Sequence, residues 1–192
     1  MEGLIIIIVA YLFGSIPLGY IFGKIKGRDI RKEGSGNIGF TNVCRVLGKR
    51  WGIPVLIFDI LKGFFFPFIS FKLGLGEKIA ILSSLFAILG QGFSIFLRFK
   101  GGKGVATSAG VFLALAPIEI TITIAIFLLA FSITRIVSIG SIVSSTSLPI
   151  LVFFISPNKR LVFVFSLVAM AFILIKHIPN IKRLLGKREY KI

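Results

Sequence analysis

The fold is decided by an uncharged run near the start of the chain, Leu4–Gly23, which reads LIIIIVAYLFGSIPLGYIFG. A helix needs about 20 such residues to cross the ~30 Å hydrocarbon core of a bilayer. Similar apolar segments follow at Trp51–Phe71, Lys78–Leu97, Ile136–Ile155 and Leu161–Ile175. With 56% hydrophobic residues and a mean hydropathy of +0.99, the 192-residue chain has too little polar surface for a water-soluble domain. We predict an all-α integral membrane protein.

The region Val105–Arg135 is divided by Pro117 and Glu119 into two further apolar segments. The first of them, Val105–Ala116, is about 18 Å long as a helix and is too short to cross the bilayer unaided. Counting both, we predict seven transmembrane helices in a single membrane-embedded domain, 1–192. The first apolar run lacks a small-residue cleavage site, so we interpret it as a retained helix and not as a signal peptide.

The basic residues are distributed unevenly, since 18 of the 23 Lys and Arg residues lie in four regions and only four lie in the other loops. The basic regions are Lys24–Arg50, Arg98–Lys103, Arg135 and Lys176–Lys191. Positive loops stay on the cytoplasmic side, so we predict the amino terminus outside and the carboxyl terminus in the cytoplasm. The same rule accounts for the net charge of +16, and we therefore predict the lipid bilayer, and no nucleic acid, as a partner.

The first basic region contains the stretch Gly34-Ser35-Gly36-Asn37-Ile38-Gly39-Phe40-Thr41-Asn42-Val43-Cys44-Arg45. Its glycines fit the spacing G-x-G-x-x-G, but that motif binds dinucleotides only after a strand, and here a membrane segment follows. Glycines let backbone N–H groups converge on an anion, and hydroxyl groups add donors. If a short helix begins at Thr41, Arg45 lies one turn later, where its planar guanidinium can hold a phosphate at two points. A flexible loop without a ligand is the alternative to a substrate site made of Ser35, Gly36, Asn37, Thr41, Asn42 and Arg45.

A second glycine-rich stretch, Lys100-Gly101-Gly102-Lys103-Gly104-Val105-Ala106-Thr107-Ser108, runs directly into an apolar segment. Free N–H groups and the positive end of the helix dipole then face the loop, which favours an anion there. The spacing differs from that of a Walker A loop, and a simple turn at the membrane edge needs fewer glycines. We predict a phosphate site made of Gly101, Gly102, Lys103, Gly104 and Thr107.

The tail contains a third group, His177-x-x-Asn180-x-x-Arg183, whose spacing of three places its members on one helical face. Pro179 fits the first turn of such a helix. We expect Glu189 to orient or neutralise this basic group, and Ser141 to reach into the same site. A lone histidine at a membrane edge is often only an interfacial polar residue, and that interpretation stands beside the functional one.

Two charges fall inside the second apolar segment, where Asp59 and Lys62 lie three residues apart. Alone, each costs about 2.5–3.5 kcal/mol at the bilayer centre, so we predict a mutual ion pair.

The sequence has no Cys/His cluster for zinc and no carboxylate pair for a two-metal site, and we predict neither a metal nor another cofactor. No covalent nucleophile is recognisable, so the substrate is expected to arrive already activated.

Together the three groups resemble the cytoplasmic motifs of the bacterial acyl-phosphate:glycerol-3-phosphate acyltransferase family. The likeness runs nearly end to end and includes Ser35–Arg45, Lys100–Thr107, His177–Glu189 and, in the first segment, Gly14-Ser15-Ile16-Pro17-Leu18-Gly19-Tyr20. It implies a multi-pass enzyme of the cell inner membrane, with its site facing the cytoplasm, that transfers an acyl group from acyl phosphate to the 1-hydroxyl of glycerol 3-phosphate. The implied products are 1-acylglycerol 3-phosphate (lysophosphatidic acid) and phosphate, and functional coupling to an acyl-phosphate-forming enzyme is a further expectation.

The residues that the resemblance marks as important are Ser35, Arg45, Lys103, Ser141, His177, Asn180 and Glu189. We assign catalysis to Ser35, Arg45, Lys103, His177 and Asn180. We assign substrate binding to Gly36, Asn37, Thr41, Asn42, Gly101, Gly102, Gly104, Thr107, Ser141, Arg183 and Glu189. The proton of the attacking hydroxyl passes to His177 or to a substrate phosphate, and both routes remain open. Two positions depart from the family: Gln91 stands where histidine is usual, and Lys187 stands where glycine is usual, with Gly186 one place earlier.

Two other functions compete with this one. A transporter or exchanger of phosphate esters needs a midplane site built from broken helices, whereas the polar residues here gather at one face. A phosphotransferase acting on phosphatidyl groups or alcohols relies on acidic metal-binding motifs that this sequence lacks.

Overall fold

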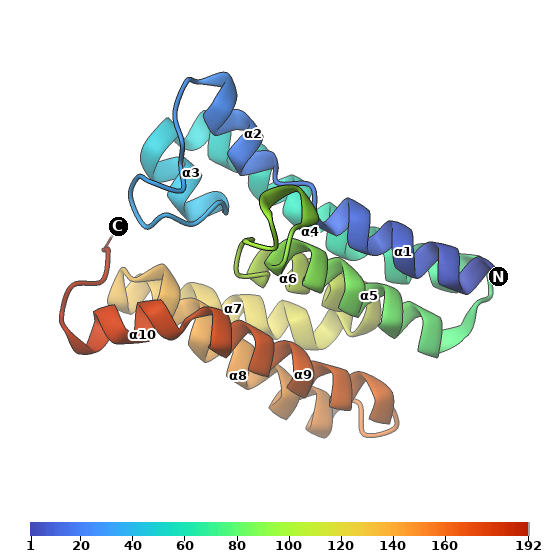
Figure 1. Cartoon of the computed structure of the whole chain (residues 1–192). Coiled ribbons are helices and arrows are strands. Elements are labelled where there is room, and N and C mark those ends of the chain that lie inside the picture. Colours follow the sequence, from blue (N-terminus) through green and yellow to red (C-terminus); the bar gives the residue numbers. More distant parts are fainter. Residues whose placement is uncertain (192) are drawn as a thin grey trace. The chain divides into compact units, whose positions relative to one another are not determined.

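The computed structural model describes residues 1–191, and within that range the chain is helical with no strand (Figure 1). The helices are α1 (Glu2–Gly14), α2 (Leu18–Ile25), α3 (Phe40–Leu47), α4 (Lys49–Lys72), α5 (Gly76–Gly92), the 3-10 helix η1 (Ile95–Leu97), α6 (Val105–Leu115), α7 (Pro117–Thr134), α8 (Val137–Ile155), α9 (Arg160–Lys176) and α10 (Ile178–Leu185). They form two compact units, residues 1–111 and the residues from Phe112 onward, with the division inside α6.

Five stretches within residues 1–191 are long and apolar enough to cross a membrane. They are α1 with α2, α4, α5 with η1, α7 and α8. A sixth is present if α9 and α10, which bend by 53° where they meet, count as one span. Helix α6 is apolar but has only 11 residues. The predicted all-α membrane fold is confirmed, with five or six candidate spans by length and composition.

The first apolar run, predicted as one retained helix, is one candidate membrane span that consists of two helices. The break falls at Pro17, which has no N–H to donate and disfavours helical backbone at Ile16. Carbonyl groups at the break accept hydrogen bonds from other parts of the chain. Ser94 Oγ donates to Ser15 O at 2.5 Å, and Lys62 Nζ donates to Ile16 O at 3.2 Å. The break therefore joins the first run to α4 and to the segment after α5.

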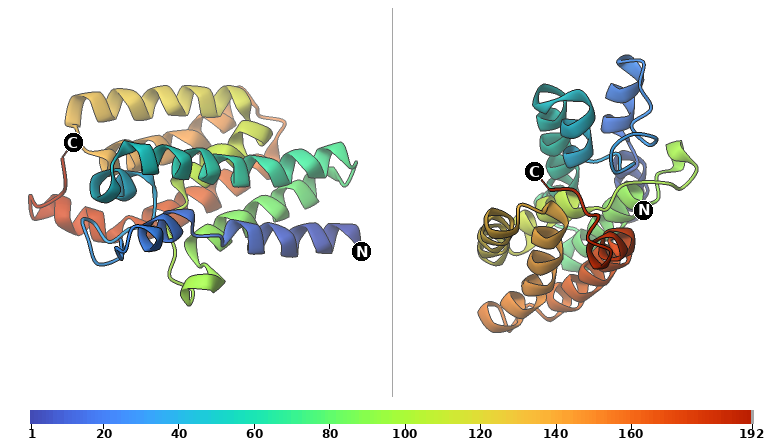
Figure 2. Two further views of the ribbon diagram at one scale, coloured as in Figure 1. Left: turned by 90° about the horizontal axis from the view of Figure 1, so that it is seen from above. Right: turned by 90° about the vertical axis from the view of Figure 1, so that its left-hand side faces the viewer.

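Within the first unit, α1 packs along α5, and α4 packs against α1, α3 and α5 (Figure 2). Glycines let these helices approach closely, as is typical of membrane helix pairs. A Cβ atom at Gly14 would meet the backbone of Ala87, and one at Gly90 would meet the backbone of Tyr11. Helices α1 and α5 are thus in backbone contact at two levels.

Helix α6 is held against α4 by one glycine on each helix. A Cβ at Gly63 of α4 would meet the carbonyl oxygen of Thr107, and a Cβ at Gly110 of α6 would meet that of Ile60. Any larger side chain at these places would push the helices apart. This contact fixes the start of α6, and with it the end of the glycine-rich loop that precedes it.

In the second unit, α8 packs against both α7 and α9 (Figure 2). The α7–α8 contact is close at Gly140, where a Cβ would lie 3.0 Å from the Phe127 ring. Helix α7 begins with Pro117 in its first turn and ends at Arg135, which has a left-handed backbone (φ 57°). The bend between α9 and α10 falls at His177, which ends the first helix and begins the second.

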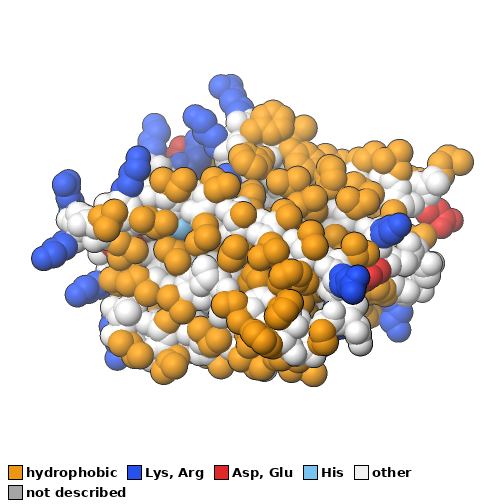
Figure 3. Space-filling model, turned by 90° about the horizontal axis from the view of Figure 1, so that it is seen from below, with side chains coloured by type: hydrophobic (Ala, Val, Ile, Leu, Met, Phe, Trp, Pro, Cys, Tyr) orange, Lys and Arg blue, Asp and Glu red, His pale blue; other side chains and the backbone are white. Residues whose placement is uncertain are grey.

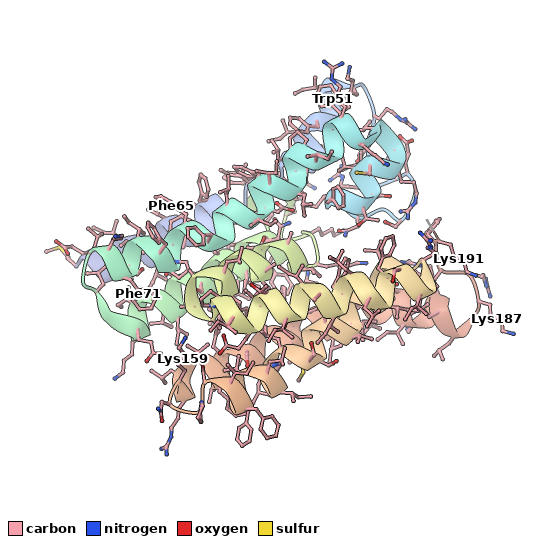
Figure 4. All side chains as sticks on the ribbon, turned by 180° about the vertical axis from the view of Figure 1, so that it is seen from behind. Trp51, Phe65, Phe71, Lys159, Lys187 and Lys191 are labelled. Atoms are coloured by element: carbon pink, nitrogen blue, oxygen red, sulfur yellow. The ribbon has the colours of Figure 1, made fainter. Side chains whose placement is uncertain are left out.

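The surface suits lipid better than water. Hydrophobic side chains cover much of the face drawn in Figure 3. On α4, Phe65 is 51% exposed and Phe71 is 45% exposed, while Trp51 lies in the first turn of the same helix (Figure 4). A soluble monomer rarely exposes apolar patches of this extent.

Candidate active site

The first glycine-rich stretch is part of a loop, residues 28–39 (the first loop), that is closed by the side chain of Asn42. Its Oδ1 accepts a hydrogen bond from the Ser35 N–H at 2.8 Å. Its Nδ2 lies 2.8–3.1 Å from the carbonyl oxygens of Ile30, Glu33 and Asn37. The side chain is buried, and an amide has little further hydrogen-bonding capacity to offer. Asn42 shapes the loop from inside, which differs from the substrate contact predicted for it.

Two glycines of the first loop have a left-handed backbone, with φ of 58° at Gly34 and 73° at Gly36. A Cβ at Gly34 would also collide with Asn42 Oδ1, so glycine is needed there for two reasons. Helix α3 then begins near Thr41, as predicted, and carries Arg45 one turn later. Arg45 is exposed, which leaves its guanidinium accessible from outside the loop.

Other basic residues of the first loop act within the fold. Arg31 forms an ion pair with Asp29 at 2.7 Å, and its hydrogen bond holds the pKa of that carboxyl well below its usual range. Arg28 pairs with Glu33 and donates to the carbonyl oxygen of Val46 at 2.6 Å. The two ion pairs lie within the first loop, and the hydrogen bond to Val46 connects the loop to α3.

The second loop, residues 98–104, connects η1 to α6. Gly104 has φ of 79° and turns the chain into α6 at Val105, the start predicted from the sequence. The Gly102 N–H donates to the carbonyl oxygen of Gln91 at 2.8 Å, and a Cβ at Gly101 would meet that same oxygen. The loop therefore rests on the end of α5, and the half-buried Lys103 follows directly.

The structure brings the first and second loops together. A Cβ at Gly102 would lie 3.6 Å from Ile38 Cγ1 of the first loop. The backbone of Ile38 in turn lies against Gly19, where a Cβ would collide with the Ile38 carbonyl oxygen. Gly19 belongs to the Gly14–Tyr20 motif, so that motif supports the first loop from α2. The two predicted phosphate sites thus form one region of the first unit.

A buried polar network lies beneath the second loop. Lys62 Nζ and Asp59 Oδ1 are 2.8 Å apart, which confirms the predicted ion pair. Gln91 bridges the pair, since its Oε1 accepts from Lys62 Nζ and its Nε2 donates to Asp59 Oδ2 at 3.0 Å. Sequence reasoning gave Gln91 no role, because its partners are 29 and 32 residues earlier in the chain.

Thr107 was predicted to contact substrate, but it is fully buried in the first turn of α6. Its carbonyl oxygen lies close to Gly63 of α4. Its Oγ1 has no hydrogen-bond partner within residues 1–191. The structure thus places Thr107 behind the second loop, at the α4–α6 contact.

In the second unit, the tail segment, His177–Glu189, is organised around the carboxylate of Glu189. Asn180 Nδ2 donates to Oε1 at 2.6 Å, Ser138 Oγ donates to the same oxygen at 3.2 Å, and Arg183 forms an ion pair with Oε2 at 2.7 Å. Burial raises the pKa of Glu189, but hydrogen bonds from Arg183 and Asn180 outweigh it, so this pKa lies below its ordinary value. This is the geometry expected of a residue that orients and neutralises the basic group.

The turn between α10 and Glu189 contains a lysine with a left-handed backbone. Lys187 has the left-handed φ of 54°, whereas Gly186 has φ of −83°, which any residue can adopt. Lys187, and not Gly186, is therefore the residue whose left-handed backbone makes the turn after α10. A side chain in that conformation costs about 1–2 kcal/mol.

His177 is buried at the junction of α9 and α10. Its Nδ1 lies 2.8 Å from the carbonyl oxygen of Ile173. A carbonyl oxygen only accepts hydrogen bonds, so Nδ1 carries the proton of the neutral ring and Nε2 is its basic nitrogen. Asn180 Oδ1 is buried and has no hydrogen-bond partner in the part of the chain that the structure describes. Asn180 Oδ1 thus offers an acceptor atom for a hydroxyl group.

Ser141 does not contact the tail through its hydroxyl, which donates to the Val137 carbonyl oxygen at 3.0 Å. The serine that reaches Glu189 is Ser138, one turn earlier on α8. Both hydroxyls lie after the Arg135 turn, and the spacing alone does not say which of them faces the tail.

The sequence model of the glycerol-3-phosphate acyltransferase family matches residues 4–187 of this chain. The chain belongs to that family. A glycerol-3-phosphate acyltransferase of Trichlorobacter lovleyi is 46% identical over 98% of this chain and 97% of its own. One of Fusobacterium nucleatum is 45% identical over 96% of this chain and 95% of its own. The resemblance predicted from the three groups of residues is confirmed.

The fold agrees with this membership of the glycerol-3-phosphate acyltransferase family. Crystal structures of PlsY (YgiH), an integral membrane glycerol 3-phosphate acyltransferase, match with 38% identity and cover 100% of this chain and 96% of the PlsY chain. The TM-scores are 0.95 for its glycerol 3-phosphate form and 0.92 for its lysophosphatidic acid form. The similarity therefore extends over the whole fold of an integral membrane protein.

Proposed function

We propose that this chain transfers an acyl group from acyl phosphate to the 1-hydroxyl of glycerol 3-phosphate, giving 1-acylglycerol 3-phosphate and phosphate in phospholipid synthesis. The observation that carries the proposal is the match, at a TM-score of 0.95, to a protein solved in a glycerol 3-phosphate form and also in a lysophosphatidic acid form. Those two molecules are the acceptor and the product of a single acylation. The family match over residues 4–187 supports the same acceptor.

In this reaction the 1-hydroxyl oxygen attacks the acyl carbonyl carbon, the bond from that carbon to the phosphate oxygen breaks, and phosphate leaves. Acyl phosphate is a mixed anhydride with a good leaving group, so no covalent enzyme intermediate is needed. The hydroxyl proton passes to His177 Nε2 or to a phosphate oxygen. Holding the two reactants in place can lower the barrier by ~7–11 kcal/mol in ideal cases.

We assign phosphate binding to the first and second loops. Arg45 and Lys103 supply positive charge, and Ser35 and the glycine N–H groups supply hydrogen bonds. Both substrates carry phosphate and repel each other in water, so neutralisation is the main electrostatic task. No group of three or more His, Cys, Asp or Glu side chains that could hold a metal ion occurs among residues 1–191, so we assign this task to Arg45 and Lys103.

We assign contact with the acceptor hydroxyl to His177 Nε2 and Asn180 Oδ1. Glu189 is a positioning residue in this proposal, because its two oxygens already accept from Asn180, Arg183 and Ser138. A carboxylate exposed to substrate would repel phosphate, whereas one that is paired with Arg183 fixes the donors around it.

The decisive experiment uses purified protein in detergent micelles with glycerol 3-phosphate and one of three donors: acyl phosphate, acyl-CoA or acyl-carrier protein. We expect product only with acyl phosphate. Arg45→Lys should raise KM for a phosphate substrate more than tenfold, since an ammonium cannot replace the bidentate guanidinium. Arg50→Lys, in the first turn of α4, is the matched control and should behave as the unchanged protein. Efficient transfer from acyl-CoA or acyl-carrier protein, both thioesters, would contradict the proposal that acyl phosphate is the donor.

We also propose seven transmembrane helices in the cell inner membrane, with the amino terminus outside and the loops of the site in the cytoplasm. The support is the clustering of 18 of 23 basic residues in four regions.

Cys44 is a poor reporter of orientation, because burial raises the pKa of its thiol and the thiolate is the reactive form. We therefore place new cysteines by Lys32→Cys and Leu73→Cys, each in a Cys44→Ala background. In intact cells an impermeant maleimide should label the Leu73→Cys variant and not the Lys32→Cys variant. The reverse pattern would show that the proposed orientation is wrong.

Transport of phosphate esters is the second candidate, because two observed breaks, at Pro17 and His177, give discontinuous helices of the kind transporters use. Proteoliposomes without acyl phosphate separate the two functions. Accumulation of labelled glycerol 3-phosphate against the empty-vesicle control would favour transport, and its absence together with acyl transfer in micelles favours the enzyme.

A further inference from the structure

Gln91, at the end of α5, places an uncharged amide between two buried charges. Its oxygen faces the Lys62 ammonium and its NH₂ group faces the Asp59 carboxylate. An amide has one acceptor end and one donor end, so these charges allow only one orientation of the side chain. Lys62 is fully buried and Asp59 is 4% exposed. Such a network is strongly held when complete, because the alternative is a buried charge without its partner.

The backbone of the same residue supports the second loop. The Gly102 N–H donates to Gln91 O at 2.8 Å, and a Cβ at Gly102 would lie 3.0 Å from Gln91 Nε2. The loop thus touches both the backbone and the side chain of Gln91. It has no regular structure of its own, and its residues Arg98 and Phe99 have the left-handed φ values of 54° and 61°. Its shape depends on what it rests against.

The network also reaches the chain break before the first loop. Lys62 Nζ donates to Ile16 O, and the nearby Gly19 lies against Ile38 of the first loop. Helix α4 carries the charges, α5 carries the amide, and the Pro17 break supplies the third acceptor. One set of buried contacts therefore connects to both loops of the site.

We propose that Gln91 is a positioning residue: the Asp59–Lys62 ion pair fixes its side chain, and Gln91 in turn holds the second loop in the conformation that receives a substrate phosphate. The inference rests on the phosphate-binding role proposed for that loop. A neutral imidazole also has one acceptor nitrogen and one donor nitrogen, so histidine is the replacement that can make the same two contacts.

The test combines a structural readout with kinetics on the full-length protein in micelles. Gln91→Met removes the amide and keeps a similar unbranched length, whereas Gln91→His keeps an acceptor and a donor. Ser84→Ala is the control, because Ser84 is buried on the same helix and, among residues 1–191, donates only to Ala80 O. Amide hydrogen exchange is measured in peptides that cover residues 98–106, and KM and kcat are measured for both substrates at pH 8.

We expect Gln91→Met to speed exchange in the second loop about tenfold or more and to raise KM for a phosphate substrate at least tenfold. Gln91→His should return both values to within threefold of the unchanged protein, and Ser84→Ala should alter neither. If Gln91→Met does not fold, Gln91→Asn, whose amide is one methylene too short to reach both charges, should show the same loosening.

Unchanged exchange and unchanged KM in Gln91→Met or in Gln91→Asn would overturn the inference. So would a loss in Gln91→Met that Gln91→His does not recover, since that result points to packing alone. Exchange does not require turnover. A protein that shows faster exchange in Gln91→Met but no acyl transfer in any variant would refute the proposed function and leave the positioning contact standing.

Discussion

The Ser35 backbone N–H and the Asn42 side-chain oxygen are 2.8 Å apart, and this hydrogen bond joins the first loop to helix α3. The other end of the same amide binds three carbonyl oxygens of the loop. A loop rich in glycine would otherwise sample many conformations, with a corresponding entropic cost of ordering it around an anion. Asn42 therefore organises the first loop before a phosphate arrives.

Asn42→Ala and Asn42→Asp test this organisation. The alanine variant leaves buried carbonyl groups without a donor, at about 1–3 kcal/mol for each orphaned group. The aspartate variant keeps the acceptor for Ser35 but sets a carboxylate against those carbonyl oxygens, so we expect it to be the less stable of the two. Unfolding temperatures and kcat/KM in micelles should fall in that order. Lys32→Ala, exposed on the same loop, is the control for the unfolding temperature, and an aspartate variant as stable as the unchanged protein would contradict the account.

Gly101→Ala and Gly102→Ala should differ in severity. A Cβ at Gly101 would meet the backbone of Gln91 and Gly92, which cannot move aside, whereas a Cβ at Gly102 meets the end of the Gln91 side chain at 3.0 Å. We expect Gly102→Ala to raise KM for a phosphate substrate several-fold and Gly101→Ala to reduce kcat/KM by a further tenfold or more. Substrate saturation curves measure both, and the reverse order would contradict the packing.

Much of the fold followed from the sequence because bilayer thickness sets the length of an apolar helix. Helices α4, α5, α7, α8 and α9 occupy the segments predicted for them, and α3 and α6 begin close to the predicted starts. The Asp59–Lys62 pair followed from a spacing of three on one helix. The break at Pro17 was missed, because a proline in an apolar run is compatible with a kinked helix as well as with two helices.

The site was less predictable where its contacts join residues far apart in the sequence, or where two residues of the same type lie at similar positions on one helix. Spacing on α8 does not distinguish Ser138 from Ser141, and only the return of the tail shows which of them reaches Glu189. Asn42 and Gln91 were missed as organising residues for a related reason. A buried amide that binds backbone groups, as in Asn42, or buried charges, as in Gln91, looks the same in sequence as one that binds substrate.

Lys187→Gly should stabilise the protein. Lys187 has φ of 54°, a conformation that glycine adopts without strain, so the substitution should recover about 1–2 kcal/mol. Lys187→Ala removes the same side chain but keeps the strain, and it should give no gain. Gly186→Ala should be tolerated, because φ is −83° there and a Cβ would lie 3.5 Å from its nearest neighbour. Unfolding temperatures of the three variants check the order, and equal values for Lys187→Gly and Lys187→Ala would contradict it.

Glu189→Gln should change how stability depends on pH. Arg183 and Asn180 hold the pKa of Glu189 below its ordinary value despite its burial. A lowered pKa stabilises the folded state above about pH 4.3, the ordinary value, and that contribution is lost as pH falls through the folded pKa. The unchanged protein should therefore unfold at a higher temperature than Glu189→Gln at pH 7, and the difference should shrink in acid. Glu2→Gln, at an exposed carboxylate, is the control, and a difference independent of pH would contradict the prediction.

His177→Ala should lose most activity, because it removes the ring that ties the α9–α10 junction to Ile173 and that we assign to the acceptor hydroxyl. The more informative change is His177→Gln, whose amide can still donate and accept hydrogen bonds but cannot act as a base near neutral pH. We expect His177→Gln to retain substantial activity with the acidic limb of the pH–rate profile intact, because the anhydride donor has a good leaving group and a substrate phosphate can take the proton. His177 would then bind the acceptor hydroxyl together with Asn180. Loss of the acidic limb with a ~10²–10⁴-fold fall in kcat would instead make His177 the general base and this assignment wrong.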